Sequence, residues 1–126
     1  MRLVDSSAWI EILLGTPVGD ALDAHLPTQD DWLVPTLVQY EIHKWLARSL
    51  SADDAEAFVS YSGTCIVVPL TTDVAIRGSE VSREHGLSTA DAIIYATALE
   101  HGADLLTCDA HFEGLPQVVY LPKANG

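Results

Sequence analysis

The sequence is short of positive charge. Its 126 residues include 6 lysines and arginines against 18 aspartates and glutamates, which gives a formal net charge of −12 at pH 7. This balance excludes the broad basic surface that nucleic-acid-binding domains commonly use. Most of the carboxylates are expected to form a solvated, self-repelling surface. If the protein acts on a polyanion, cations must take part at its site.

Cysteines and long apolar runs are also scarce. Cys65 and Cys108 each lie in an apolar run without a cysteine or histidine at metal-ligand spacing, which predicts buried, reduced thiols in a cytoplasmic protein. Asp5 and Glu11 interrupt the first apolar segment, so no signal peptide is expected. No run approaches the length of a membrane span, and we expect no membrane association.

The sequence does contain alternating strand-like and helical segments. We expect strands at 2–5, 31–35, 65–70, 103–107 and 117–121. We expect helices at 6–15, 16–27, 36–50, 51–62, 71–86 and 88–102, and a short turn or helix at 109–115. This order predicts an α/β fold with three layers (α/β/α) and a mainly parallel central sheet. We expect a single domain over 1–126, with a loose tail at about 122–126.

Local patterns add detail to these segments. The strand at 65–70 reads CIVVPL, a continuous β-branched run that is typical of a strand buried on both faces. Thr36 with Gln39, and Ser51 with Asp54, have the spacing of helix-capping pairs. These two pairs therefore predict where two of the helices begin.

Two aspartates directly follow predicted strands. Asp5 closes the first strand, and Asp109 follows the strand at 103–107 with only Cys108 between them. Because ligand sites in open α/β sheets form beyond the carboxyl ends of the strands, both carboxylates are expected at one edge of the sheet. The alternative is that each aspartate caps the helix after it. Ser6 is a further candidate cap for the first helix.

Two more acidic residues lie on predicted helices. Ser88-x-x-Asp91 is a capping pattern, which accounts for Asp91 without any function. Yet the residues one turn further on are apolar, so we expect Asp91 to face the interior or a cleft. Glu41 could form a surface ion pair with Lys44. It also borders an apolar stripe that includes Ile42, which would turn it partly inward.

Together these four carboxylates predict more than each does alone. Like charges in one pocket raise each other's pKa, so a cluster of four is unfavourable unless a cation is present. Mg²⁺ and Mn²⁺ prefer oxygen ligands and bridge to phosphate oxygens. Such a site supports hydrolysis of a phosphodiester by a metal-activated water.

The residues and their order resemble the PIN-domain family and, more closely, the VapC-type toxins of bacterial toxin–antitoxin pairs. The resemblance runs from the first strand to about Phe112 and is carried by the segments RLVDSSAWIEIL, LVQYEIHKWLARSL and GLSTADAIIYATALEHGADLLTCDAHF. It implies a metal-dependent endoribonuclease toxin that uses Mg²⁺ or Mn²⁺. A domain of this family would cut RNA, such as tRNA, form a homodimer, and be neutralised by a cognate VapB-type antitoxin.

The resemblance also implies which residues form the site. The acidic positions of the family would correspond to Asp5, Glu41, Asp91 and Asp109, as catalytic residues and metal ligands. Three hydroxyls fall where the family places a hydroxyl near the site, those of Ser6, Ser7 and Thr107. They could orient a carboxylate, hold a water or cap a helix. His111 could touch substrate; the alternative is a surface residue without a role in the site.

Two non-enzymatic interpretations compete with the nuclease. A receiver-like signalling module has similar length and architecture, and Lys123 could serve as its late lysine. However, Asp5 lacks the acidic neighbour that such a module needs. The second is a PIN-like fold kept for protein binding. For the nuclease, Lys44 and Arg48 share a helix face with Glu41 and are candidate phosphate contacts.

Overall fold

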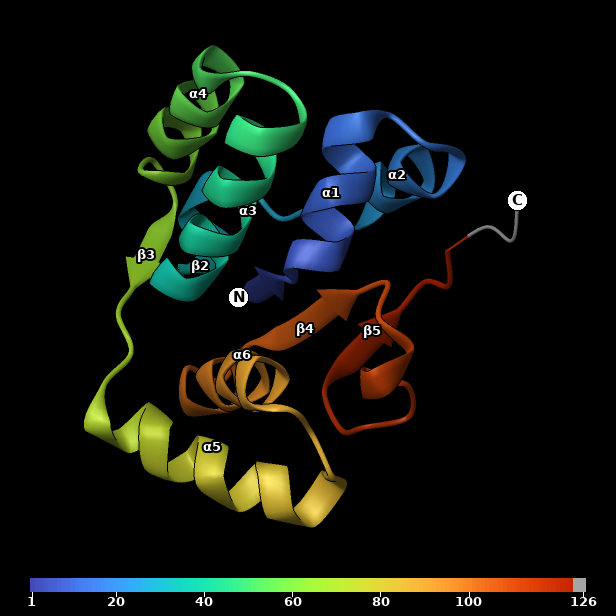
Figure 1. Cartoon of the computed structure of the whole chain (residues 1–126). Helices are drawn as coiled ribbons and strands as arrows, with labels where there is room; N and C mark the ends of the chain where they lie inside the picture. The colour runs from blue at the N-terminus through green and yellow to red at the C-terminus, as the bar shows by residue number, and fades with distance from the viewer. Residues whose placement is uncertain (124–126) are drawn as a thin grey trace.

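Five parallel strands form one sheet in the computed structural model, which describes residues 1–123 (Figure 1). The strands are β1 (Arg2–Val4), β2 (Trp32–Pro35), β3 (Ile66–Val68), β4 (Asp104–Thr107) and β5 (Val118–Tyr120). The α-helices are α1 (Ser6–Leu14), α2 (Pro17–Leu22), α3 (Thr36–Ser49), α4 (Ala52–Ser62), α5 (Thr72–His85) and α6 (Thr89–Glu100). Short 3₁₀ turns are η1 (Asp23–His25), η2 (Gln29–Asp31) and η3 (Ala110–Phe112). The α/β class and the parallel sheet are confirmed.

The strand order places a switch point in the middle of the sheet. The order is β3-β2-β1-β4-β5, so the chain moves outward in one direction from β1 and in the other direction from β4. Right-handed crossovers then require α1 to α4 on one face and α5 with α6 on the other. Figure 1 shows these two helical layers on opposite sides of the sheet. The crevice beyond the carboxyl ends of β1 and β4 is where such folds bind ligands.

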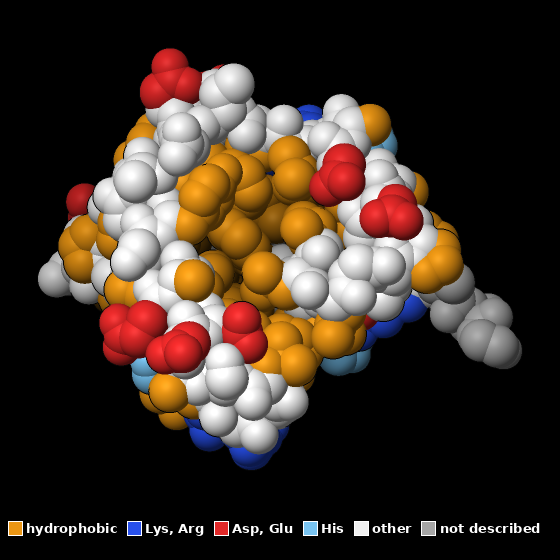
Figure 2. Space-filling model, turned by 90° about the horizontal axis from the view of Figure 1, so that it is seen from above, with side chains coloured by type: hydrophobic (Ala, Val, Ile, Leu, Met, Phe, Trp, Pro, Cys, Tyr) orange, Lys and Arg blue, Asp and Glu red, His pale blue; other side chains and the backbone are white. Residues whose placement is uncertain are grey.

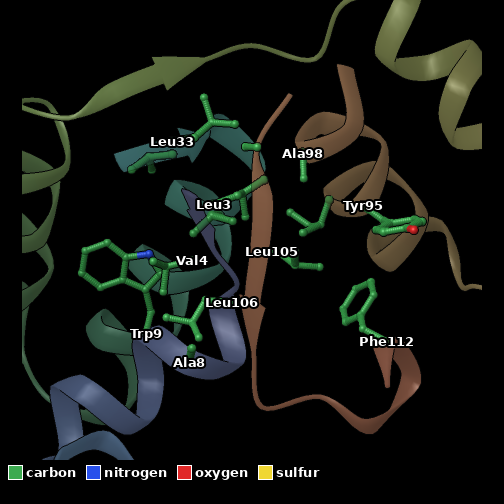
Figure 3. Packing of buried hydrophobic residues seen from close by; sticks show 14 of the residues in the cluster. Leu3, Val4, Ala8, Trp9, Leu33, Tyr95, Ala98, Leu105, Leu106 and Phe112 are labelled. Carbon is green, nitrogen blue, oxygen red and sulfur yellow. The ribbon is translucent and has the colours of Figure 1, made fainter. Parts of the chain in front are cut away.

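The core lies on both faces of the two central strands. Leu3, Leu105 and Leu106 are fully buried. Figure 3 shows these leucines between Trp9 of α1 on one side and Tyr95 of α6 on the other. The apolar run of α6 is thereby explained, because that helix is covered by α5 on its outer side and by the sheet on its inner side. This packing fixes the start of α6, where Asp91 lies.

Two local predictions are wrong. The strand β3 is not buried on both faces, because it is an edge strand and Val67 is exposed. Thr36 does not cap α3: Pro35 occupies the N-cap position without a side-chain bond, and Gln39 donates instead to Ser62 Oγ at 3.0 Å. The burial prediction fails because β3 lies at the edge of the sheet, and the capping prediction fails because Pro35 precedes Thr36 at the N-cap position.

The capping prediction for α4 is confirmed. Ser51 accepts a hydrogen bond from the Asp54 amide and caps α4. Both cysteines are free; Cys108 is buried as predicted, whereas Cys65 is only half-buried. No helix in residues 1–123 is long and apolar enough to cross a membrane. The predicted tail at 122–126 lies partly outside the residues that the structure describes.

Candidate metal centre at the carboxyl edge of the sheet

Asp5 is the buried centre of the acidic cluster. It follows β1, and its amide donates to the Leu106 carbonyl of β4 at 2.9 Å, which extends the pairing of the two strands by one residue. Its side chain makes no capping bond to α1, although the residue occupies the N-cap position. Instead, Ser7 Oγ and Thr107 Oγ1 both donate to Asp5 Oδ2, at 2.7 and 2.9 Å. The residue is 6% exposed.

The two hydroxyls connect Asp5 to the backbone of β4 and the loop after it. Ser7 Oγ accepts from the Cys108 amide at 3.0 Å, and Thr107 Oγ1 accepts from the Asp109 amide at 2.9 Å. Each hydroxyl has a single proton, already given to Asp5, so the 3.2 Å contact between Ser7 and Thr107 adds no further bond. Ser7 and Thr107 therefore orient a carboxylate, one of the three roles left open by the sequence.

Burial raises the pKa of Asp5 to about 6. The hydrogen bonds from Ser7 and Thr107 lower it, and the negative charge of Asp109 raises it further. A carboxylate that is buried beside another carboxylate is held at a cost in stability. A cation that binds next to Asp5 would remove that cost.

Asp91 and Asp109 converge on one histidine. His111 Nδ1 lies 3.2 Å from Asp91 Oδ2 and 3.3 Å from Asp109 Oδ1. Asp109 also accepts the His111 amide at 2.9 Å and so caps η3, which means that the capping role and the site position coexist. Asp91 is 19% exposed, and its own amide donates to Ser88 Oγ at 3.4 Å. Asp91 therefore lies in the first turn of α6 and is mostly buried beside His111.

Glu41 contacts Ser6, the residue that follows Asp5 in the sequence. The half-buried Glu41 accepts a hydrogen bond from Ser6 Oγ at 2.8 Å, across the gap between α3 and α1. Ser6 is therefore not the cap of α1, because its hydroxyl is directed at a neighbouring helix. Within residues 1–123, Glu41 makes no ion pair with Lys44, whose ammonium lies 5.7 Å from the centre of the Tyr40 ring.

The structure brings some of the predicted site residues together and leaves others apart. Among the described residues, the group whose ligand atoms lie within 4.8 Å of one another consists of Asp91, Asp109 and His111. Asp5 couples to this group through Asp109, whereas Glu41 is outside it and bonded to Ser6. From the sequence, His111 was only a possible substrate contact, whereas the structure places it beside both Asp91 and Asp109. The feature of the sequence that indicates this position is the two-residue spacing of Asp109 and His111, since the short turn η3 brings their side chains together.

Most of this chain matches a known protein family. The profile of the PIN domain matches residues 2–117. The chain belongs to the PIN-domain family. Ribonuclease VapC19 of Mycobacterium tuberculosis is 26% identical to this PIN domain over 125 residues, which cover 94% of this chain and 97% of that protein. The resemblance predicted from the sequence is thereby confirmed.

Solved structures agree with this assignment. A chain of a toxin–antitoxin complex from Klebsiella pneumoniae matches this PIN domain with a TM-score of 0.81 at 25% identity, over 94% of this chain and 96% of that chain. Mycobacterium tuberculosis VapC20, a sarcin-ricin loop cleaving toxin, shares the fold with a TM-score of 0.71 at 22% identity, over 92% and 95% of the two chains. A receiver-like module is not supported by these matches.

Proposed function

We propose that this PIN domain is an endoribonuclease toxin that hydrolyses RNA phosphodiester bonds with a divalent cation and is neutralised by an antitoxin. One observation carries the proposal. Asp91 and Asp109 lie within reach of one ion, the buried Asp5 senses the charge of Asp109, and in residues 1–123 no lysine or arginine is paired with any of the three. The similarity to Ribonuclease VapC19 supports RNA as the substrate.

The residues present fit a divalent cation. Ligands of one Mg²⁺ ion lie about 2.0–2.1 Å from it, so their atoms fall within the 4.8 Å span seen for Asp91, Asp109 and His111. The carboxylates suit Mg²⁺ or Mn²⁺, whereas an imidazole ligand is more typical of transition metals. We infer that Asp5, Asp91 and Asp109 hold the cation with Glu41, and that His111 is a further candidate ligand. Such a cation supplies Lewis-acid stabilisation of phosphate charge and a more acidic water.

The chain's own residues provide orientation. Ser7 and Thr107 fix one oxygen of Asp5, and Ser6 fixes Glu41 against α1. Side chains whose rotamers are fixed in this way lose little freedom when a ligand arrives. His111 lies at the open side of the cluster, where it is 74% exposed and accessible to an RNA strand.

A cleavage assay tests this function. The wild-type chain is incubated with tRNA and with single-stranded RNA in Mn²⁺, in Mg²⁺ and in EDTA, and fragments are resolved on a gel. We expect cleavage with either metal and none in EDTA. Cleavage that persists in EDTA would contradict the mechanism, and intact RNA under all conditions would contradict the activity.

The antitoxin has a candidate binding surface on the α1–α4 face. A hollow of about 240 Å³ is lined by apolar residues of α1, α4 and the end of α3, among them Trp9, Leu13 and Phe58. Figure 2 shows this apolar hollow with acidic side chains around it. An amphipathic segment with basic residues matches both features. Because Asp5 occupies the N-cap position of α1, a segment that lies along this helix can reach from the hollow to the acidic cluster.

Co-expression tests the partner. A neighbouring open reading frame that encodes a VapB-type protein should relieve growth arrest and co-purify with the wild-type chain. Leu13→Glu places a like charge in the hollow and should abolish co-purification, whereas the surface change Ile76→Glu on α5 should not. Light scattering of the purified chain tests the homodimer that the family resemblance implies. We place the activity in the cytoplasm, where its RNA substrate resides.

A further inference from the structure

A second hollow adjoins the acidic cluster on the side of β5. It has a volume of about 530 Å³, and its lining includes Ser7, Asp109, Tyr120 and Lys123. Ser7 and Asp109 also belong to the candidate metal centre, so the two sites share a wall. Pockets of about 300–1,000 Å³ accommodate small organic ligands. The hollow is therefore large enough for one nucleotide of a strand that passes the acidic cluster.

The sheet register places an aromatic ring at this wall. Tyr120 ends β5 and pairs with Thr107 of β4, and the Leu121 amide donates to the Thr107 carbonyl at 3.0 Å. Thr107 is the residue whose hydroxyl holds Asp5. Tyr120 is thus one strand away from the buried end of the acidic cluster, and it is half-buried, which limits the freedom of its ring.

The charge at this hollow is unusual for the chain. Lys123 is exposed and lines the hollow. The other basic residues lie elsewhere: Arg2 pairs with Asp104, and Arg77 with Glu100. Lys44, Arg48 and Arg83 belong to α3 and α5 and do not line this hollow. In a chain of net charge −12, a lysine beside the acidic cluster is well placed to contact a phosphate.

We propose that this hollow is a nucleotide subsite, in which Tyr120 stacks on the base next to the scissile phosphate and Lys123 contacts the adjoining phosphate. The inference rests on the proposed ribonuclease function and extends it to substrate binding. Stacking on an aromatic ring together with a nearby cation is a common way to bind single-stranded nucleic acid. Such a subsite would hold the strand in register with the metal centre without reading the base strictly.

The test compares Tyr120→Leu, Tyr120→Phe and Lys123→Ala with the wild type. A short fluorescein-labelled single-stranded RNA of mixed sequence is titrated in Ca²⁺, and cleavage of the same RNA is mapped in Mn²⁺. Tyr40→Leu and Arg83→Ala are matched controls, since both residues are exposed and lie on other elements. Thermal melting checks that Tyr120→Leu folds, and Lys123→Ala changes a surface residue only.

The subsite predicts distinct losses for the two side chains. Tyr120→Leu should weaken RNA binding between about 5-fold and 100-fold and shift the cleavage positions, while Tyr120→Phe keeps both. Lys123→Ala should reduce the slope of log affinity against log salt by about 0.7. The subsite would be overturned if Tyr120→Leu and Lys123→Ala both kept the wild-type affinity and cleavage positions. It would also be overturned if the wild type bound no RNA.

The outcomes separate this inference from the proposed function. If the wild type cleaves RNA and neither variant changes binding or cleavage positions, the ribonuclease stands and the subsite is wrong. If the wild type binds RNA with these losses in the variants but does not cleave it in Mn²⁺, the subsite stands and the ribonuclease is wrong.

Discussion

Carboxylates at the two edges of the sheet have opposite surroundings and opposite pKa shifts. At the amino edge, Arg2 Nε and Nη2 donate to the two oxygens of Asp104 at 2.8 and 2.9 Å, and the amino group of Met1 lies 3.4 Å from Asp31. The Arg2 guanidinium lowers the pKa of Asp104. At the carboxyl edge, burial raises the pKa of Asp5 to about 6. The chain supplies a cation to Asp104, whereas Asp5 has no basic partner within residues 1–123.

This contrast separates structural acids from candidate functional acids without reference to any relative. Asp104 acquires a cation from the chain. At the other edge, the hydrogen bonds to Asp5 fix its orientation without supplying a positive charge. Perturbed carboxylates in a crevice are candidates for function. We infer that the missing charge at the carboxyl edge comes from a bound cation.

The largest expected effect comes from removing a carboxylate at each edge. Asp91→Asn should reduce RNA cleavage in Mn²⁺ by at least about 100-fold, because loss of residues that merely support a metal ligand already costs about 10–100-fold. Asp104→Asn removes the same charge at the amino edge and should leave the rate within about 2-fold. Equal losses in both variants, measured by initial rates, would remove the distinction between the edges.

A smaller effect is expected from the hydroxyl that orients Asp5. Thr107→Val keeps the shape of the side chain but removes its bonds to Asp5 and to the Asp109 amide. We expect Mn²⁺ affinity to fall by about 10–100-fold, as measured by the metal-dependent rise in melting temperature. Thr97→Val is the matched control, because Thr97 is equally buried and bonds only its own helix at Ile93. Unchanged Mn²⁺ affinity in Thr107→Val would show that Asp5 needs no such support.

The pKa of Asp5 predicts a pH-dependent stability. Its folded value of about 6 lies above the ordinary value of 3.8, so the folded state is penalised as Asp5 ionises. Asp5→Asn should therefore stabilise the metal-free protein by up to about 3 kcal/mol above pH 6, and the difference should vanish below about pH 4. Urea unfolding in EDTA across this range measures it. A destabilised variant at pH 7 would contradict the assigned cost of burial.

The smallest effect is expected at the amino edge. Arg2→Ala leaves the partly buried Asp104 without its cation and should lower the free energy of unfolding by about 1 kcal/mol at pH 7. Because Arg2 lowers the pKa of Asp104, this contribution is present above the ordinary pKa and is lost as the pH falls below it. Urea unfolding at neutral and acidic pH checks the sign. RNA cleavage at a temperature where the variant is folded should not change.

The sequence predicted the elements of the fold and which acids share an edge, for identifiable reasons. Strand and helix periods were clear, and parallel strands bring their carboxyl ends together, so Asp5 and Asp109 could be paired in advance. Contacts between elements were not predictable. Ser6 bonds Glu41 across two helices, and His111 reaches Asp91 only because η3 turns it back. The register of β5, which brings Tyr120 beside Thr107, also depends on tertiary pairing.

Calorimetric titration with Mn²⁺ tests the central claim most directly, because it measures cation binding without requiring any RNA. The wild type and Asp104→Asn should bind Mn²⁺ with the same affinity and stoichiometry, whereas Asp91→Asn should bind it at least about 100-fold more weakly. The account would be contradicted if the wild type bound no Mn²⁺, or if Asp91→Asn bound it as tightly as the wild type.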